Sequence, residues 1–281
     1  MVPAAVLLFA VAVGGAMPVA AGEPASPVAL DGRPAQGALV RGTAPPGALL
    51  WLGGKQQRVD PDGSFVIGFG RDQTGTVALE IALPGGGRRV ERLAVARRDW
   101  PVQRIDGLPS AQVSPDAAAL ERIHAEQRRL DAARAADSAE QGYRAAFRWP
   151  ATGPISGVYG SQRILNGEPR APHLGLDIAA PEGTLVQAPA AGVVRLAEPD
   201  LFFTGGTVIL DHGHGVMTLY AHLSAIDVAV GQRLAAGAPI GRVGRTGRVT
   251  GPHLHFALYW RGIALDPAGL LPEAAPAAPS N

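Results

Sequence analysis

The stretch GPHLHFALY, residues 251–259, alternates histidine with large apolar side chains. Successive side chains of a β-strand point to opposite faces, so residues two apart share a face. His253 and His255 would then lie on one face. Leu254 and Phe256 would point the other way, toward a core. The alternation predicts a strand that brings two imidazoles to one site; an ordinary pair of core or surface histidines is the alternative.

Strand-like runs continue through the C-terminal half of the chain. Glycine and proline separate them, as in Pro181-Glu182-Gly183 and Gly205-Gly206. Runs of this length between turn residues are typical of antiparallel sheets. The pattern predicts an antiparallel β domain over residues 149–272, the size of one compact unit. The clearest predicted strands are Thr184–Ala188, Gly192–Leu196, Thr207–Leu210, Met217–His222 and His255–Tyr259.

Residues 22–100 predict a smaller β domain. Apolar runs such as Ser64–Ile67 and Val77–Leu83 alternate with turn signals such as Asp60-Pro61-Asp62-Gly63. Strands at this spacing are typical of a small antiparallel sandwich. The region contains no histidine, and we find no catalytic cluster in it.

Residues 101–148 predict a helical linker, so that the whole chain is mainly β with one connecting helix. Ser114-Pro115-Asp116 offers an N-cap, a proline at the first helical position and an early acid. Apolar residues follow at helical spacing, and the helix is expected to end near Arg148, before Trp149-Pro150. His124 lies on this helix, far in sequence from other candidate ligands, and we expect an ordinary surface histidine.

The two ends of the chain are predicted to lie outside these domains. The first 21 residues contain no charged side chain, and Ala4–Val13 is a continuous apolar run. With the small residues Val19-Ala20-Ala21 after it, this run is typical of a cleaved secretory signal peptide. A membrane anchor is the alternative, since about 20 apolar residues can span a bilayer. Either interpretation places the rest of the chain outside the cytoplasm, and residues 273–281 are expected to form a flexible tail.

The composition limits the chemistry of a metal site. The 281 residues carry a net charge of +1 and include no cysteine, which excludes disulfides and thiolate ligands. A metal would have to be bound by histidine, aspartate or glutamate. The even charge balance gives no indication of a nucleic-acid partner.

Six of the seven histidines lie between residues 173 and 255. His173 and Asp177 are close in sequence, but a straight strand would separate them by about 13 Å. They can share a metal only if the chain bends near Gly175. A catalytic zinc takes three protein ligands and a water, so this cluster leaves further histidines for proton transfer and oxyanion stabilisation. The helical His-Glu-x-x-His arrangement is absent from the sequence.

His212 and His214 form a second His-x-His pair in Asp211-His-Gly-His-Gly215. The alternating glycines predict a hairpin turn between Leu210 and Val216. We expect both histidines to be solvated turn residues, and a role at the rim of the site is the alternative.

Three motifs therefore stand in order in the C-terminal half: His173-Leu-Gly-Leu-Asp177, Tyr220-Ala-His-Leu-Ser224 and Gly251-Pro-His-Leu-His-Phe256. Together they resemble the lysostaphin-type (LytM-type) zinc metallopeptidases of cell-wall turnover. The resemblance covers about residues 150–271. It implies an open antiparallel β-sheet fold with a groove over one zinc ion per chain. It also implies zinc ligands and catalytic residues, which are His173, Asp177 and His255 for the metal and His222 and His253 for catalysis.

The resemblance implies a zinc-dependent endopeptidase that cleaves peptidoglycan stem peptides or cross-links through a metal-activated water. The alternative is a catalytically silent envelope module that activates another cell-wall hydrolase, since some relatives have lost zinc ligands. All five key positions are occupied by the expected residues here, which favours the enzyme. The expected partners are peptidoglycan peptides as substrate and an envelope protein for the alternative. A membrane contact is expected only if the N-terminal segment stays uncleaved.

Overall fold

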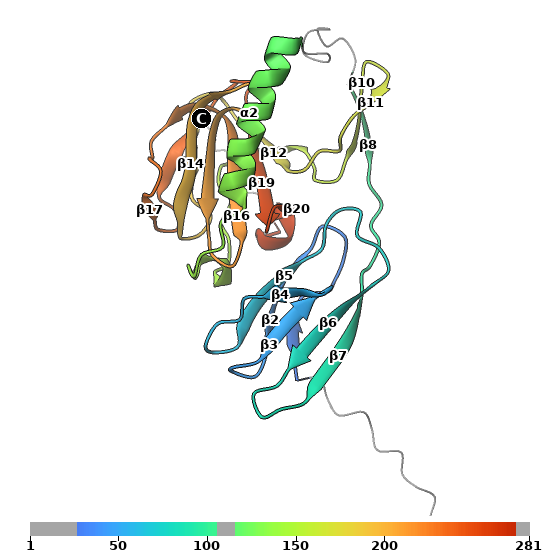
Figure 1. Ribbon diagram of the computed structural model, residues 1–281. Helices are drawn as coiled ribbons and strands as arrows, with labels where there is room; N and C mark the ends of the chain where they lie inside the picture. Colours follow the sequence, from blue (N-terminus) through green and yellow to red (C-terminus); the bar gives the residue numbers. More distant parts are fainter. Residues whose placement is uncertain (1–26, 106–115, 274–281) are drawn as a thin grey trace, which may run out of the picture.

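The computed structural model describes residues 27–105 and 116–273, and its fold is mainly β with one α-helix, as the sequence predicts (Figure 1). The expected signal peptide, nearly all of the expected tail and Ser114-Pro115 lie outside the described residues. In the part of the chain that is described, no helix is long and apolar enough to cross a membrane. The proposed domain boundaries stay predictions.

Two antiparallel sheets form a sandwich in the N-terminal part (Figure 1). Alternate side chains of both sheets, such as Ile67 and Leu79, are fully buried in one shared core. Gly42 allows this packing, because a Cβ there would lie 2.4 Å from the ring of Phe65. One sheet has the order β1(Ala29–Asp31), β2(Leu39–Thr43), β5(Ser64–Gly68), and the other β4(Lys55–Gln57), β3(Leu49–Leu52), β6(Thr76–Ala82), β7(Arg88–Ala94).

The C-terminal part is built on one large antiparallel sheet (Figure 1). Its main path runs β17(Arg233–Leu234), β14(Gly192–Leu201), β15(Gly205–Asp211), β16(Val216–Ile226), β19(His253–Trp260), β12(Leu176–Ala179), β9(Ile155–Gly157). Also attached are β18(Pro239–Val243), which pairs with β13(Leu185–Gln187) and β16, and β20(Ile263–Leu265), which pairs with β19. The central strands are covered on both faces, so that every residue of β15 is buried.

The helix α2(Ala117–Arg134) covers one face of this sheet (Figure 1). Leu130 packs there with Ile209, Leu219 and Tyr259. The buried carboxylate of Glu126 accepts a hydrogen bond from the backbone of Phe202, at 2.7 Å. The helix is therefore fixed to the sheet by both an apolar and a polar contact.

The helix is shorter than predicted, and the prediction of its two ends was wrong. Asp116 is the N-cap, since its side chain accepts from the backbone of Ala119 at 2.8 Å. The helix ends at Arg134 and does not reach Arg148. The helix ends early because of tertiary contacts. Tyr143 and Phe147 are buried against the large sheet beside His212 and do not continue the helix. Only a short 3-10 helix, η1(Gly142–Arg144), forms there.

A third small sheet was not predicted. The strand β8(Val102–Ile105) pairs in parallel with β10(Gln162–Leu165), which pairs with β11(Glu168–Pro169). Residues 102–105 were assigned to the helical linker, but they are a strand because their partner comes from the C-terminal part. The stretch 101–148 is thus only partly helical.

A buried polar cluster joins the sandwich to the large sheet. Asp60, in the turn before β5, accepts from the hydroxyl of Tyr143 at 2.6 Å and contacts His214 Nε2 at 3.0 Å. The imidazole of His214 stacks on Tyr143 with ring centroids 4.3 Å apart. Arg144 also donates to the Asp60 carboxylate. The expectation that His214 is solvated was therefore wrong, because the hairpin turn is covered by the sandwich and the linker.

His212 is also buried, against expectation. Its Nδ1 donates to the carbonyl of Ala191 and its Nε2 accepts from the hydroxyl of Thr218, both at 2.8 Å. Burial lowers the pKa of His212 to about 4, so the neutral ring is a structural element of the hairpin. Neither histidine lies among the residues of the metal centre described below.

We predict that Asp60→Ala lowers the free energy of unfolding by about 3 kcal/mol, because it leaves the buried Tyr143 hydroxyl without its acceptor and removes one of the two carboxylates that pair with Arg144. Equilibrium unfolding in urea measures this change. Asp72→Ala is the control: its carboxylate is largely exposed and pairs only with the neighbouring Arg71, so less than about 1 kcal/mol is expected. Equal effects of the two substitutions would contradict the role of the cluster.

The difference in unfolding free energy between wild type and Asp60→Ala should depend on pH. Burial disfavours the charged form of Asp60, but hydrogen bonds from Tyr143, Arg144 and Gln141 outweigh it and lower its pKa to about 2. This lies below the unfolded value of about 3.9. The contribution of Asp60 is therefore complete above the unfolded pKa and is lost as the pH falls through the folded one. A stability gap between wild type and Asp60→Ala that persists at about pH 2 would contradict this linkage.

Candidate metal centre

Strand pairing brings Asp177 and His255 together. They are direct partners in the register of β12 and β19, and Asp177 Oδ1 lies 2.8 Å from His255 Nδ1. The neighbouring side chains of Ile178 and Leu254 are fully buried on the opposite face. The alternation predicted from residues 251–259 thus puts the polar side chains on one face of the sheet.

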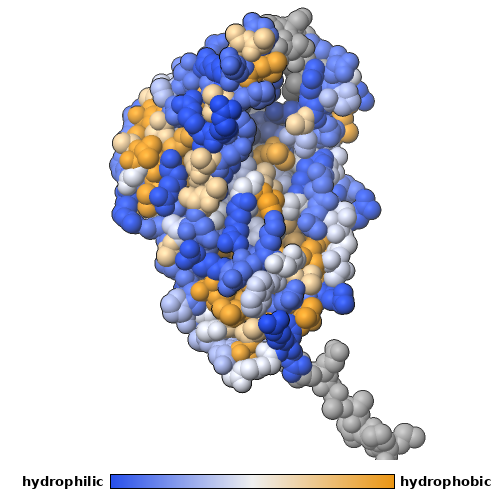
Figure 2. Space-filling model, viewed as in Figure 1, coloured by the Kyte–Doolittle hydropathy of each residue, from blue (hydrophilic) through white to orange (hydrophobic). Residues whose placement is uncertain are grey.

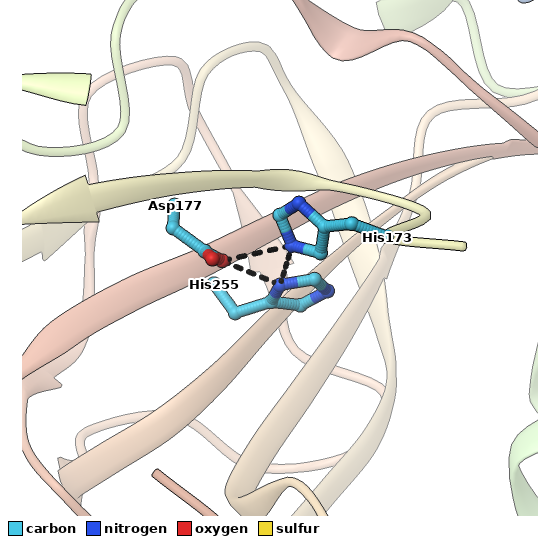
Figure 3. A group of neighbouring side chains, drawn as sticks. All are labelled: His173, Asp177 and His255. Carbon is cyan, nitrogen blue, oxygen red and sulfur yellow. Dashed lines mark hydrogen bonds and ion pairs between the residues drawn. The ribbon is translucent and has the colours of Figure 1, made fainter. Parts of the chain in front are cut away.

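His173 joins them because the chain bends before β12. Its Nε2 lies 3.0 Å from both Asp177 Oδ1 and His255 Nδ1 (Figure 3). Gly175 makes the bend possible, since a Cβ there would lie 2.5 Å from the His255 ring and 2.8 Å from the Phe256 carbonyl. Figure 3 shows the three side chains converging from the bend and from two neighbouring strands.

The hydrogen bonds and charges of these three side chains favour the binding of a cation. His173 Nδ1 donates to the carbonyl of Val158 at 3.1 Å, so the neutral ring presents the lone pair of Nε2 to the other two residues. Burial lowers the pKa of His255. Burial opposes the charged form of Asp177, yet the hydrogen bonds and positive charge that His173 and His255 supply when protonated outweigh it and hold the pKa of this carboxyl well below its usual range. Two imidazole nitrogens and one carboxylate oxygen therefore face one point.

This donor set could hold a metal ion. Two imidazole nitrogens and a carboxylate oxygen are ligands that zinc accepts in catalytic sites. Zinc bonds of about 2.0–2.1 Å at tetrahedral angles separate ligand atoms by about 3.3 Å. The observed separations of 2.8–3.0 Å are a few tenths of an ångström shorter, so small side-chain movements are enough.

Gly157 and Arg163 lie next to Oδ2 of Asp177, the carboxylate oxygen that does not face the two histidines. A Cβ at Gly157 would lie 2.4 Å from Asp177 Oδ2, and Arg163 Nη2 lies 3.6 Å from the same oxygen. Gly157 lies in β9, directly opposite Asp177. Neither residue belongs to the three motifs, so neither was predicted as a site residue. Arg163 carried no local signal, because its position depends on the pairing of β8 with β10.

His222 and His253 lie next to the three converging residues. Their ring centroids are 4.7 Å apart, and His253 Nε2 is 3.8 Å from Asp177 Oδ1. His222 Nδ1 donates to the carbonyl of Thr246, and His253 Nδ1 to that of Gly251, both at 2.9 Å. Nδ1 of each ring is therefore bound to the backbone, which leaves Nε2 for the site.

His222 is held in an unusual backbone conformation. Its φ is 64°, a region in which non-glycine residues are uncommon. The backbone is fixed there by a hydrogen bond from its N–H to the Thr204 carbonyl, at 2.8 Å. Burial, with repulsion from His255 and His253, lowers the pKa of His222 to about 3. The structure thus brings together all five residues that the resemblance singled out, while His124 lies apart from them, exposed on α2.

The comparison with known proteins agrees with the fold and the motifs. The family described as Peptidase family M23 matches residues 171–267, which include all three motifs. The crystal structure of a putative peptidase M23 from Pseudomonas aeruginosa is 32% identical, with a TM-score of 0.66, over 85% of this chain and 95% of that chain. The chain belongs to peptidase family M23. The resemblance stated from the sequence is confirmed.

Curated members of the family match the C-terminal part. The peptidoglycan DD-endopeptidase ShyA of Vibrio cholerae is 48% identical over 92 residues, which are 33% of this chain and 21% of that protein. The murein hydrolase activator EnvC of Escherichia coli is 41% identical over 119 residues, or 42% of this chain and 27% of that protein. The matched region thus spans about a fifth to a quarter of the length of these relatives.

We predict that Gly157→Ala weakens metal binding by about 10- to 100-fold, the usual effect of disturbing a group that orients a ligand. The new methyl group would displace the Asp177 carboxylate. Competition with a chromophoric chelator measures the affinity. Gly269→Ala is the control, since a Cβ there meets no atom within 4 Å. An unchanged affinity in Gly157→Ala would show that the carboxylate is not held by this contact.

Proposed function

We propose that this protein is a zinc-dependent endopeptidase that hydrolyses peptide bonds of peptidoglycan stem peptides or cross-links. One observation carries the proposal: three donor atoms of buried or half-buried side chains converge on one point, and two further imidazoles, each bound to the backbone through Nδ1, lie beside them. Three protein ligands are what a catalytic zinc uses, whereas a structural zinc uses four. In this assignment, one zinc ion per chain is held by His173, Asp177 and His255.

The remaining histidines supply the proton chemistry. Bound zinc would act as a Lewis acid that polarises a peptide carbonyl and makes a water molecule more acidic. His222 Nε2 or His253 Nε2 takes the proton of the attacking water as general base. The other ring, in its protonated form, donates a hydrogen bond from Nε2 to the oxyanion that forms on the carbonyl. The Nδ1 bonds to Thr246 and Gly251 hold both rings in the orientation that these roles require.

The low pKa of His222 fits a group that must be neutral before the reaction. Burial is its main cause, and the positive charges that His253 and His255 would carry add to it. A ring with this pKa is unprotonated at neutral pH and can accept a proton. Transfer of that proton to the leaving amine would complete the hydrolysis.

The substrate and location are inferred from the family. Relatives named as peptidoglycan DD-endopeptidases support a cell-wall peptide as substrate and an exported protein of the periplasm or cell envelope. The relative named as a murein hydrolase activator supports a second candidate, a silent module that acts on an envelope partner. The complete set of two catalytic and three metal-binding positions favours the enzyme.

We predict near-stoichiometric zinc in the purified protein and its loss in His255→Ala. Metal analysis by mass spectrometry after dialysis checks both. His124→Ala is a matched control, because it removes an exposed histidine from α2. Zinc retained at the wild-type level in His255→Ala would rule out this ligand assignment.

We predict that His222→Ala and His253→Ala abolish cleavage while zinc stays bound. Loss of a general base costs about 10²–10⁴ in rate, and loss of an oxyanion donor about 10²–10³. Because the two rings act together, the double variant need not be much slower than either single one. Incubation of purified muropeptides with each zinc-loaded variant, with products identified by mass, measures the effect.

The same experiment separates the two candidate functions. Full activity in both single variants would contradict the mechanism. Zinc lost from His222→Ala would make His222 a fourth ligand and the site a structural one. A zinc-loaded wild type without peptidase activity on any muropeptide would favour the activator.

A further inference from the structure

The helix α2 lies on the same face of the large sheet as the metal centre. Residues two apart in a strand share a face, so Ala257 and Tyr259 of β19 lie on the face of His255. Both of them belong to one buried cluster with Leu130 of α2. Figure 2 shows the surface hollowed between the part of the molecule that carries α2 and the part formed by β8, β10 and β11. The helix precedes the family match at residues 171–267, and the proposed mechanism gives it no role.

Glu126 is a buried carboxylate on α2, only 6% exposed. Its Oε2 accepts a hydrogen bond from the Phe202 backbone at 2.7 Å, and its Oε1 accepts one from Arg122 Nε at 2.6 Å. Arg122 Nη2 also donates to the carbonyl of Asp200 at 2.9 Å and to its carboxylate at 3.0 Å. The two side chains thus attach α2 to the chain on both sides of Leu201, the last residue of β14. The contact is specific, because burying the carboxylate without such partners would be unfavourable.

The turn at residues 202–204, between β14 and β15, holds His222. The Thr204 carbonyl accepts a hydrogen bond from the backbone N–H of His222 at 2.8 Å. Directly after the turn, the Gly206 N–H donates to Thr246 Oγ1 at 2.9 Å. Thr246 is the residue whose carbonyl accepts the Nδ1 proton of His222. The turn and the start of β15 therefore support both the backbone and the ring of His222.

The backbone conformation of His222 makes this support necessary. A residue with a Cβ is unfavourable at a φ of 64° and stays there only where the surrounding structure holds it. Phe202, which Glu126 binds, lies two residues before Thr204, which binds His222. Without Glu126 the Phe202 N–H would lose its acceptor, and the turn would lose one of its fixed points. A shift of about 1 Å in the His222 ring would then be enough to slow the reaction about 10²-fold.

We propose that Glu126, assisted by Arg122, is a positioning residue that holds His222 in its catalytic orientation through the turn at residues 202–204. The helix of the linker then supports the active site and does more than connect the two β domains. The effect on catalysis rests on the proposed endopeptidase function, whereas the structural link between Glu126 and His222 does not. The two parts are therefore tested by separate measurements.

The structural link is tested in the full chain without substrate, by NMR. In Glu126→Ala the backbone amide of His222 should exchange with deuterium roughly 10- to 100-fold faster, the usual effect of losing a hydrogen bond to a charged group. The Nδ1 proton of His222, identified by its loss in His222→Ala, should change its chemical shift. Glu126→Gln should keep part of the protection, because its amide oxygen can still accept from the Phe202 backbone.

The effect on catalysis is tested with the zinc-loaded protein and purified muropeptides. Glu126→Ala should lower kcat by about 10- to 100-fold with little change in KM and none in zinc affinity, because it displaces His222 and not the metal ligands. Arg122→Ala, at a side chain that is 45% exposed, should act in the same direction and serves if Glu126→Ala does not fold. Arg129→Ala is the matched control: it removes an ion pair between α2 and Glu198 of β14 but leaves the turn attached, and should behave as wild type.

Two results would overturn the proposal. One is unchanged amide exchange and an unchanged ring signal of His222 in both Glu126→Ala and Arg122→Ala. The other is an equal change in Arg129→Ala, which would reflect a general loosening of α2. Faster exchange at His222 in a protein whose wild type cleaves no muropeptide would support the structural link and contradict the endopeptidase. A wild type that cleaves muropeptides, with kcat unchanged in Glu126→Ala, would support the endopeptidase and contradict the positioning role.

Discussion

The pairing of β12 with β19 is the constraint on which the metal centre depends. It places Asp177 opposite His255, and the buried Ile178 and Leu254 hold this register from the other face of the sheet. Side chains alternate with a period of two, so a slip by one residue would turn Asp177 toward the core and Ile178 toward the site. Hydrophobic burial on one face therefore fixes the positions of the polar groups on the other.

Backbone carbonyls fix the remaining histidines. Val158, Thr246 and Gly251 each accept the Nδ1 proton of one imidazole, so that Nε2 of each ring is left for the site. His255 is the exception, because its Nδ1 faces Asp177. The loops that supply these carbonyls are held by glycines that approach the backbone closely, such as Gly244, where a Cβ would lie 2.4 Å from Ser224 N. The orientation of the imidazoles thus depends on the conformation of these loops.

Local patterns predicted the parts of the fold that local physics controls. Alternation in residues 251–259 predicted the strand and its two faces, and Gly175 indicated where a bend could form. The five site residues came from the motif resemblance. Burial of His212 and His214 was missed because it depends on Ala191, Asp60 and other residues distant in sequence. The same holds for the strand at 102–105, whose partner lies in β10.

Two of the contacts between the sandwich and the C-terminal part have different consequences. Asp60 contacts His214, which precedes β16, whereas His222 lies eight residues further along, about 26 Å away at ~3.3 Å per residue. That contact therefore stabilises the end of the sheet remote from the metal. The second contact is near it: Arg71 Nε donates to the Gly160 carbonyl at 2.9 Å, and the Gly160 N–H donates to the His173 carbonyl at 2.7 Å. Through this chain of two hydrogen bonds the sandwich helps to hold His173, a role that requires no binding surface of its own.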